Sequence, residues 1–280
     1  MNIDEAYKKY GQKLSCIFPE SEAEQNVKYI ISEILTCSIP DLLINKEKQL
    51  STTQIKKIEE TVTQRANHTP LQYIFKKAYF RDLELYVNKG VLIPRPETEI
   101  LVDIAITHLP MKGKLCDIGC GSGAIPLSIA YERQDSEVIA IDFHPIPLEI
   151  TKINIEKYSL KNVKTQHSDL LSEVKKQEFD VITANLPYVT IDEYNELEKE
   201  VAEFEPITAL VAEDNGMRLI NKLILQAPDY LKQNGFLILE IGEQQGNATM
   251  ESLKSCEKFH DIKVIKDYNQ KDRFVIAFRN

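Results

Sequence analysis

The chain has 280 residues, of which 43% are hydrophobic and 28% are charged, with ten glycines and twelve prolines. This balance is typical of a globular protein and excludes collagen-like, low-complexity and disordered chains. The formal net charge of −9 at pH 7 argues against a protein that binds nucleic acid mainly through phosphate contacts. At about 150 residues per domain, the length predicts two domains, or one domain with an appendage.

The cysteines follow no pattern typical of disulfides or of a zinc site. Five are spread along the chain, and only Cys116 and Cys120 lie close together, without a second pair or a histidine cluster. The N-terminal segment lacks the apolar core of a signal peptide, and no apolar run approaches the ~20 residues of a membrane span. We therefore expect a cytoplasmic protein with free thiols that binds no metal and no membrane.

The first 75 residues have the hydrophobic spacing of helices. Apolar side chains recur every three or four positions over residues 27–35. Residues 21–24 (SEAE) predict a capping box at the start of this helix, and residues 51–54 (STTQ) predict another. The segment therefore predicts a small helical bundle, over residues 1–75, that binds or positions a partner.

The rest of the chain is predicted to be a hairpin followed by an α/β domain. Tyrosine and aliphatic residues alternate around Arg81 and Asp82, which predicts a β-hairpin linker over residues 76–92. Strands and helices alternate from residue 114, which indicates a mostly parallel sheet covered on both faces. The strands are expected at 114–118, 137–143, 163–168, 179–184, 235–241, 262–266 and 273–278, the last two antiparallel, and the helices at 124–131, 146–158 and 216–231.

A glycine-rich segment, Asp117-Ile-Gly119-Cys-Gly121-Ser-Gly123, follows the first of these strands. Its glycines permit positive φ angles and a close approach of a ligand to the backbone, and the next helix begins with free N–H groups. Asp142 ends the following strand, where its carboxylate can accept hydrogen bonds from both hydroxyls of a ribose. The segment therefore predicts a site for a ligand that contains a nucleoside.

Two classes of ligand fit this segment. Gly119, Gly121 and Ala124 satisfy the loose dinucleotide fingerprint, with Asp142 about 20 residues further on, as in an NAD-dependent oxidoreductase. The same residues fit the glycine loop of S-adenosylmethionine-dependent methyltransferases, whose ligand carries no phosphate. Asp117 favours the methyl donor, because a carboxylate attracts an ammonium group and repels a pyrophosphate. A tight turn that binds no ligand is the third alternative.

The tetrapeptide Asn185-Leu186-Pro187-Tyr188 follows the strand predicted at 179–184, at the carboxyl edge of the same sheet, so it should face the same pocket. An amide or aromatic amine nitrogen attacks a methyl group only when its conjugated lone pair is turned toward that carbon. The Asn185 side-chain oxygen and the Leu186 carbonyl can each accept one N–H, which fixes this geometry and stabilises the developing positive charge. Pro187 keeps Leu186 extended, and Tyr188 offers a flat face to a planar substrate. The tetrapeptide predicts methyl transfer to nitrogen without a metal or a strong base.

Several segments together resemble a known family. They are residues 70–74 (PLQYI), 91–99 (VLIPRPETE), 117–124, 168–169, 185–188, 205–206, 209–210, 215–216 and 239–245 (LEIGEQQ). In these segments the chain resembles the PrmC/HemK family, the N5-glutamine methyltransferases of peptide chain release factors, and residues 92–99 are the most distinctive. The resemblance implies an N-terminal helical bundle, a β-hairpin linker and, over residues 93–280, a class I S-adenosylmethionine-dependent methyltransferase domain with a Rossmann-like, mostly parallel seven-stranded sheet.

The resemblance also implies roles for single residues. The methionine part of S-adenosylmethionine would lie on the glycine loop, the ribose would meet Asp142, and the adenine would lie beside Asp169 and Leu170. The residues assigned to the cofactor are Asp117, Gly119, Cys120, Gly121, Ser122, Gly123, Asp142, Asp169, Leu170 and Asn185. Those assigned to catalysis, which would hold the glutamine amide of the Gly-Gly-Gln loop, are Asn185, Leu186, Pro187 and Tyr188. The segment over residues 94–99, with Glu97 and Glu99, would line the active site.

The chain departs from the family pattern at three places. Leu186 stands where the family usually has a proline, Leu170 stands where an aromatic residue is common, and residues 212–215 replace a glycine-rich stretch. We expect these changes to affect rate and affinity more than the type of reaction.

Two further alternatives concern function. An Asn-Leu-Pro-Tyr sequence is similar to the motif of ribosomal RNA adenine-N6 methyltransferases, and a catalytically inactive scaffold would also tolerate Leu186. Residues 76–280 carry 33 acidic and 25 basic residues, which favours a protein substrate over RNA. The expected partner is a release factor, with no stable binding of nucleic acid, and the chain is expected to be a monomer.

Overall fold

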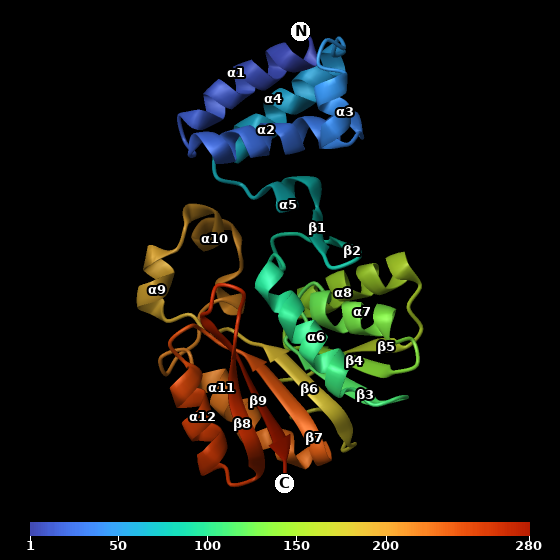
Figure 1. Ribbon diagram of the computed structural model, residues 1–280, viewed down its shortest axis with the longest axis vertical. Helices are drawn as coiled ribbons and strands as arrows, with labels where there is room; N and C mark the ends of the chain where they lie inside the picture. The colour runs from blue at the N-terminus through green and yellow to red at the C-terminus, as the bar shows by residue number, and fades with distance from the viewer. The chain divides into compact units, whose positions relative to one another are not determined.

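The computed structural model describes all residues from Met1 to Asn280 (Figure 1). The chain divides into two compact units, Met1–Lys76 and Lys77–Asn280. The hairpin predicted at residues 76–92 falls within the second unit, together with the large sheet.

The first unit is a bundle of helices around one apolar core. The helices are α1 (Ile3–Ser15), α2 (Glu20–Leu35), α3 (Ile39–Ile44), α4 (Thr52–Ala66) and α5 (Leu71–Phe75). The apolar stripe predicted on α2 is buried, since Val27, Ile30 and Ile31 pack with Ile58 and Val62 of α4. Burial of these stripes against one another stabilises helices that would be marginal alone.

One predicted helix start is confirmed and the other is wrong. Ser51 caps α4, and the Gln54 side chain bonds back to the Ser51 N–H, as a capping box requires. The box predicted at Ser21 does not form, because α2 begins at Glu20 with Pro19 as its N-cap and no side-chain cap. Proline fits the start of a helix, so Ser21 lies inside the first turn.

In the second unit a two-stranded hairpin precedes the main sheet, as predicted. Strands β1 (Lys77–Phe80) and β2 (Leu83–Tyr86) pair antiparallel. The Tyr86 N–H donates to Asn154 Oδ1 at 2.7 Å, and the Glu84 N–H donates to the Tyr158 hydroxyl at 2.7 Å. Both acceptors lie on helix α8 (Pro145–Tyr158), so the hairpin is fastened to the edge of the α/β layer.

The main sheet has seven strands in the order β5-β4-β3-β6-β7-β9-β8. The strands are β3 (Lys114–Ile118), β4 (Glu137–Asp142), β5 (Val163–His167), β6 (Phe179–Asn185), β7 (Leu231–Glu240), β8 (Phe259–Lys266) and β9 (Asp272–Arg279). The first five in this order pair in parallel, whereas β9 is antiparallel to both β7 and β8. The mostly parallel sheet with an antiparallel pair at its end is therefore confirmed.

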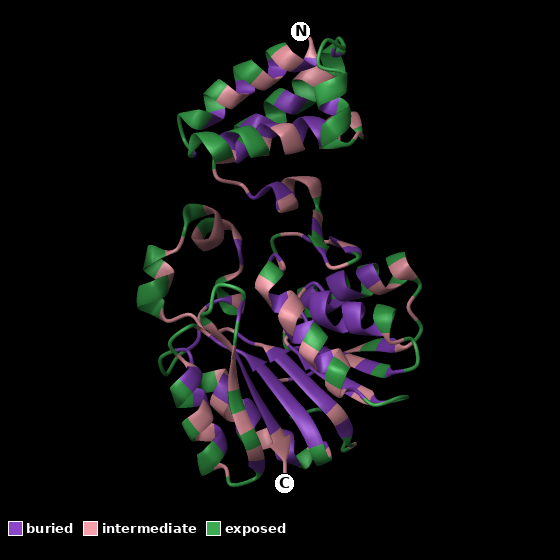
Figure 2. Cartoon of the chain, viewed as in Figure 1, coloured by how far each residue is buried: buried purple, intermediate pink, exposed green.

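Helices cover both faces of this sheet, and the strands are buried between them (Figures 1 and 2). One core contains side chains of α6 (Glu99–His108) and α7 (Ala124–Glu132), and Val181 of β6 points into it. The core on the other face contains side chains of α11 (Arg218–Gln226) and α12 (Gly246–Ser255), and receives Ile182 of β6. Successive residues of one strand thus serve opposite cores, which explains why the strands are apolar throughout.

The segments between these elements differ from the prediction in two respects. The helix expected at 216–231 ends at Gln226, and a 3₁₀ turn over Ala227–Asp229 leads directly into β7. Pro228 explains the early end, because proline cannot continue the hydrogen-bond ladder of a helix. The sequence pattern did not predict the helices α6 and α12, nor the short helices η1 (Pro96–Thr98), α9 (Ile191–Glu196), α10 (Lys199–Phe204) and η2 (Ile207–Ala209).

Candidate active site

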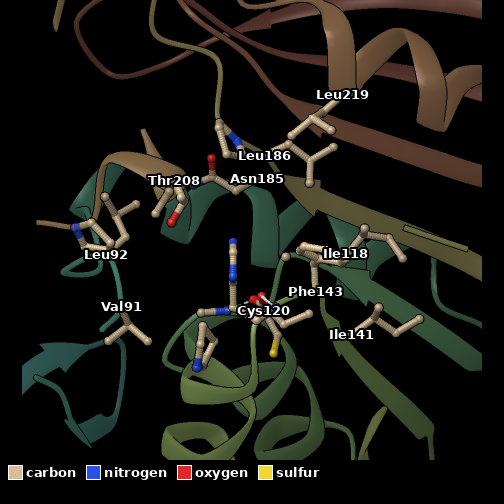
Figure 3. Close-up of a pocket in the computed structure, with 18 of the residues that line it drawn as sticks. Val91, Leu92, Ile118, Cys120, Ile141, Phe143, Asn185, Leu186, Thr208 and Leu219 are labelled. Carbon is tan, nitrogen blue, oxygen red and sulfur yellow. Dashed lines mark hydrogen bonds between the residues drawn. The ribbon is translucent and has the colours of Figure 1, made fainter. Parts of the chain in front are cut away.

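A cavity of about 660 Å³ opens at the carboxyl edge of the sheet, beyond the ends of β3, β4 and β6. Crevices at this edge are the usual ligand sites of open α/β sheets. The residues that line the cavity lie within seven stretches of chain: 89–98, 118–125, 141–147, 168–170, 185–187, 206–213 and 218–222. Figure 3 shows Asn185 and Leu186 on one side of this space, with Cys120 across from them and Ile118 and Ile141 beside it.

The glycine loop forms one wall of the cavity. Gly119, Gly121 and Gly123 have φ angles of 77°, 55° and 87°, which explains the choice of glycine at each position. The N–H groups of Gly119 and Cys120 both donate to the Ile141 carbonyl at 2.8 Å, which fastens the loop to the end of β4. Gly119, Cys120, Gly121 and Ser122 line the cavity, whereas Gly123 lies behind it as the N-cap of α7.

Asp142 lies at the end of β4 and joins the glycine loop to the start of α8. Its Oδ2 accepts the Gly121 N–H at 3.1 Å, and its Oδ1 accepts the His144 N–H at 3.0 Å. Burial raises the pKa of Asp142, and these backbone N–H groups oppose that shift. Asp142 lines the cavity, and each of its oxygens can accept a further hydrogen bond.

Asp117 is brought to the same end of the sheet, but its side chain does not line the cavity. It is fully buried beneath the glycine loop, where Oδ1 accepts the Thr183 hydroxyl at 2.6 Å and Oδ2 has no partner. Burial without a counter-charge raises the pKa of Asp117 to about 7. In this structure the carboxylate does not reach the cavity, so the predicted contact with an ammonium group is not seen, and its charge would act on a ligand there through its electric field.

This buried carboxyl predicts that the protein loses stability as the pH rises. The unfolded pKa of an aspartate is about 4, so between pH 4 and 7 the folded state holds a proton that the unfolded state has lost. The free energy of unfolding therefore falls as the pH rises through the folded pKa of about 7. We expect Asp117→Asn to reduce this fall by up to ~1.4 kcal/mol per pH unit, as measured by urea unfolding between pH 5 and 8.

Glu240 contributes a fall of the same sign, because burial also raises its pKa to about 7, so the variant should flatten the profile only partly. Thr183→Val is the matched control, since it removes the hydroxyl that donates to Asp117 but keeps the carboxyl. An Asp117→Asn profile as steep as that of the native protein would contradict the interpretation.

Asp169 and Leu170 line the cavity at the end of β5. Asp169 Oδ2 accepts a hydrogen bond from Lys222 of α11 at 2.5 Å. Leu170 adopts a positive φ of 53° and is buried, which turns the chain at this point away from the sheet. A planar group that enters here meets one carboxylate, one ammonium and an aliphatic surface rather than an aromatic ring.

Asn185 and Leu186 present two unused acceptors at the cavity. The Asn185 Nδ2 donates to Thr98 Oγ1 at 3.4 Å, whereas no group of the protein donates to the Asn185 Oδ1. The Leu186 carbonyl likewise receives no hydrogen bond from the protein. Both residues line the cavity together with Pro187, so the two acceptors predicted from the tetrapeptide lie at one wall, next to the glycine loop.

Tyr188 is not among the residues that line the cavity, although the tetrapeptide predicted a packing face there. Its ring packs with the apolar core that covers one face of the sheet, and its hydroxyl receives a hydrogen bond from Arg273 Nη1 at 3.4 Å. Burial raises the pKa of Tyr188 to about 12. The side chain therefore holds the loop in place rather than offering its face to a ligand in this cavity.

The backbone of the tetrapeptide is held by Gln245 and Gly216. Gln245 Nε2 donates to the Tyr188 carbonyl at 2.9 Å and to the Asn215 carbonyl at 3.0 Å. Gly216 lies against the same Tyr188 carbonyl, so closely that a Cβ on it would stand 2.0 Å from that oxygen. The segments at 215–216 and 239–245 therefore support the tetrapeptide without reaching the cavity themselves.

The segment over residues 92–99 contributes to the site only in part. Leu92, Pro94, Arg95 and Thr98 line the cavity, but the predicted carboxylates do not. Glu99 Oε1 instead accepts the Arg81 N–H at 2.9 Å, which fastens the β1–β2 turn.

Three residues that sequence reasoning did not single out complete the site. Glu205 is buried, and its Oε1 accepts Arg95 Nη2 at 2.6 Å, which joins the segment before η1 to the chain after α10. Thr98 and Glu240 lie buried behind Asn185. Glu205 and Glu240 fall within segments quoted for the family resemblance, but only the structure shows that both carboxyl groups are buried.

The structure has neither a cluster of metal ligands nor a membrane-spanning helix. No group of three or more histidine, cysteine, aspartate or glutamate side chains is arranged to hold a metal ion. None of the helices combines the length and the apolar character that crossing a membrane requires.

Comparisons with known proteins show the family to which the chain belongs. Residues 6–75 match the PrmC N-terminal domain, and residues 111–274 match a family described as a methyltransferase domain. The release factor glutamine methyltransferase of Clostridium acetobutylicum is 34% identical over 260 residues, which cover 91% of each chain. The Escherichia coli protein of the same name is 37% identical over 233 residues, 82% of this chain and 83% of that one. The chain belongs to the release factor glutamine methyltransferase family.

The family membership confirms the resemblance found in the sequence motifs. Among solved structures, a methyltransferase from Pyrococcus furiosus superposes with a TM-score of 0.54 at 21% identity, covering 70% of this chain and 89% of that one. At this level of identity the likeness concerns the fold, and it confirms the class I methyltransferase architecture of the second unit.

Proposed function

We propose that this protein transfers a methyl group from S-adenosylmethionine to the side-chain amide nitrogen of the glutamine in the Gly-Gly-Gln loop of a peptide chain release factor. The observation that carries the proposal is the pair of unused acceptors, Asn185 Oδ1 and the Leu186 carbonyl, at the wall of a cavity that also contains the glycine loop. The family membership of the chain supports the choice of glutamine over an RNA base.

The cavity has the size and the chemical groups that this donor needs. Its volume of about 660 Å³ is in the usual range for cofactor sites. In the proposed arrangement the methionine part lies on the backbone of residues 119–122, the ribose hydroxyls donate to Asp142, and the adenine lies between Asp169 and Leu170. Asp117, below the loop, favours the ammonium group through its field. When bound, S-adenosylmethionine supplies an electrophilic methyl group on a positively charged sulfur.

The protein's contribution to chemistry is to orient the acceptor nitrogen. A primary amide has two N–H groups, and in the proposed arrangement one donates to Asn185 Oδ1 and the other to the Leu186 carbonyl. With both hydrogens held in place, the nitrogen lone pair points out of the amide plane toward the glycine-loop side of the cavity. Both acceptors also stabilise positive charge on nitrogen during transfer. The proton leaves to water afterwards, so no side-chain base is needed.

The first unit is proposed to bind the release factor outside the Gly-Gly-Gln loop. Two observations support this: residues 6–75 match the PrmC N-terminal domain, and the bundle has no cluster of catalytic side chains. A protein partner, rather than RNA, is consistent with the net charge of −9.

Mass spectrometry of a co-expressed release factor tests the proposal. We expect one added methyl group on the glutamine of the Gly-Gly-Gln loop, with the remaining glutamines unchanged. A release factor with that glutamine replaced by alanine is the matched control and should gain no methyl group. Calorimetry supplies the donor test, in which S-adenosylhomocysteine should bind and NAD should not. Methyl groups that enter ribosomal RNA and not the release factor would overturn the proposal.

A further inference from the structure

Glu240 is a buried carboxyl group that the proposed transfer does not use. It is the last residue of β7, where it lies beside Asn185, the last residue of β6, in the register of the parallel pair. Only 3% of Glu240 is exposed, and it does not line the cavity. Its Oε2 has no hydrogen-bond partner. Such a buried group costs free energy of folding, so its presence calls for an explanation.

The groups around Glu240 come from three elements. The side chains of Thr98, at the end of η1, and of Asn185 lie close enough to its carboxyl to favour the ionised form and lower its pKa. Arg273 of β9 attracts the ionised form, and Glu97 of η1 disfavours it. Arg273 is in turn held by Asp267, whose Oδ2 accepts its Nε at 3.4 Å, and by the Tyr188 hydroxyl.

The same cluster contains the second partner of Asn185. Thr98 Oγ1 accepts a hydrogen from Asn185 Nδ2 at 3.4 Å, and Thr98 is itself buried. An asparagine side chain has two N–H donors on one side and one acceptor oxygen on the other. Whatever surrounds its nitrogen therefore decides where its oxygen points.

We propose that Glu240 is a positioning residue that, as a carboxylate, turns the Asn185 amide so that its oxygen faces the substrate. A carboxylate accepts hydrogen bonds and donates none, so it binds the Asn185 Nδ2 and rejects the Oδ1. With Thr98 taking the other hydrogen, both donors of Asn185 have acceptors within the protein, which leaves the oxygen for the substrate. This inference rests on the proposed function, since it explains how the acceptor for the glutamine amide is kept in place.

Protonation of Glu240 would remove its preference for the Asn185 Nδ2 over the Oδ1. Its O–H can donate to the Asn185 Oδ1, which allows the amide to turn and place its NH₂ group toward the cavity. The NH₂ group of a substrate glutamine would then face another donor, and the productive geometry would be lost. Burial raises the pKa of Glu240 to about 7; the polar side chains of Thr98 and Asn185 and the charge of Arg273 oppose this shift, and Glu97 adds to it. The two forms therefore exchange near neutral pH.

The test is the pH dependence of kcat at saturating donor and release factor. Saturation with donor removes the contribution of Asp117, which acts on donor binding, and a glutamine amide does not titrate in this range. We expect kcat of the native protein to rise by about tenfold per pH unit below pH 7 and to level off above it. We expect Glu240→Gln to lower kcat by about 100-fold and to abolish the rise, because a glutamine at this position can bind either end of the Asn185 amide and does not titrate.

Two variants serve as controls. Glu240→Asp keeps the carboxylate and should restore a pH-dependent rise, at a lower kcat. Asp267→Asn changes another buried carboxyl of the same cluster that does not bond to Asn185, and it should keep a pH-dependent rise in kcat, shifted in pH because Arg273 is then freer to favour ionised Glu240. Calorimetry with S-adenosylhomocysteine should give the same affinity within threefold for each variant, since none of these changes touches the donor site.

The outcomes separate the two proposals. If the native protein adds no methyl group to the release factor glutamine, the proposed function itself is wrong. If it does, but Glu240→Gln retains native kcat and the native pH profile, the positioning proposal is overturned and the function stands. Should Glu240→Gln fail to fold, the native profile decides: a kcat that is constant from pH 5.5 to 8.5 overturns the proposal, and a rise that levels off near pH 7 supports it.

Discussion

Replacing Asn185 with alanine is expected to lower kcat for glutamine methylation by about 100- to 1000-fold, the usual cost of losing one group that stabilises charge in a transition state. The variant removes the Oδ1 acceptor and leaves the Leu186 carbonyl, so one N–H of the substrate amide is no longer held. We expect kcat to fall and the affinity for the donor to stay unchanged, because the glycine loop and Asp142 stay in place. Single-turnover transfer to a purified release factor measures the loss.

Donor binding provides the control for this variant. Calorimetry with S-adenosylhomocysteine should give an affinity within about threefold of native, since Asn185 only borders the donor part of the cavity. Asn247→Ala is the matched substitution, because Asn247 is exposed on α12 and makes no hydrogen bond through its side chain. Unchanged turnover of Asn185→Ala would show that the oriented-amide mechanism is wrong.

Replacing Gly216 with alanine should damage both stability and turnover. The new Cβ would stand 2.0 Å from the Tyr188 carbonyl oxygen and 2.4 Å from Gln245 Nε2, and the φ of 79° disfavours any side chain. Overpacking and backbone strain together should lower the free energy of unfolding by about 3 kcal/mol. The new Cβ should displace the Tyr188 carbonyl, and with it the carbonyl of Leu186, which lies two residues earlier in the chain. Because this carbonyl is one of the two acceptors, kcat should fall by about 10- to 100-fold.

Urea unfolding and steady-state kinetics at 25 °C measure these two effects. Gly11→Ala is the control, because Gly11 lies in α1 with no atom within 4 Å of a new Cβ, and alanine there should raise stability by about 0.5–1 kcal/mol. A Gly216→Ala protein with native stability and native kcat would mean that the contact between Gly216 and the tetrapeptide is not needed for the site.

The sheet and the main features of the site were predictable because their signals are local. Continuous apolar strands between helical segments predict a parallel sheet, and glycines after a strand predict the ligand loop. The loop and the Asn185 segment each follow a strand, so a sheet edge brings them together without further information. The structure places Asp142, Leu170 and Leu186 at that edge as expected.

The directions of individual side chains were not predictable in the same way. Asp117 points beneath the loop toward Thr183, because side chains alternate along a strand and the next residue, Ile118, lines the cavity. Tyr188 turns into the core because burial of its ring is more favourable than exposure at the cavity. Nothing in the local sequence links Thr98 or Glu240 to Asn185, because only the completed sheet brings these residues together.

The hydrogen bond between Asn185 and Thr98 joins residues 87 positions apart, and β6 is held between β3 and β7 by parallel pairing alone. Contacts over such long separations form slowly in folding, since the entropy of closing large loops opposes them until the sheet is nearly complete. A partly folded chain can have its helices and even its glycine turn, yet no oriented acceptor pair. We therefore expect catalytic competence to be acquired only in the last steps of folding, when the sheet brings the acceptor pair to the cavity.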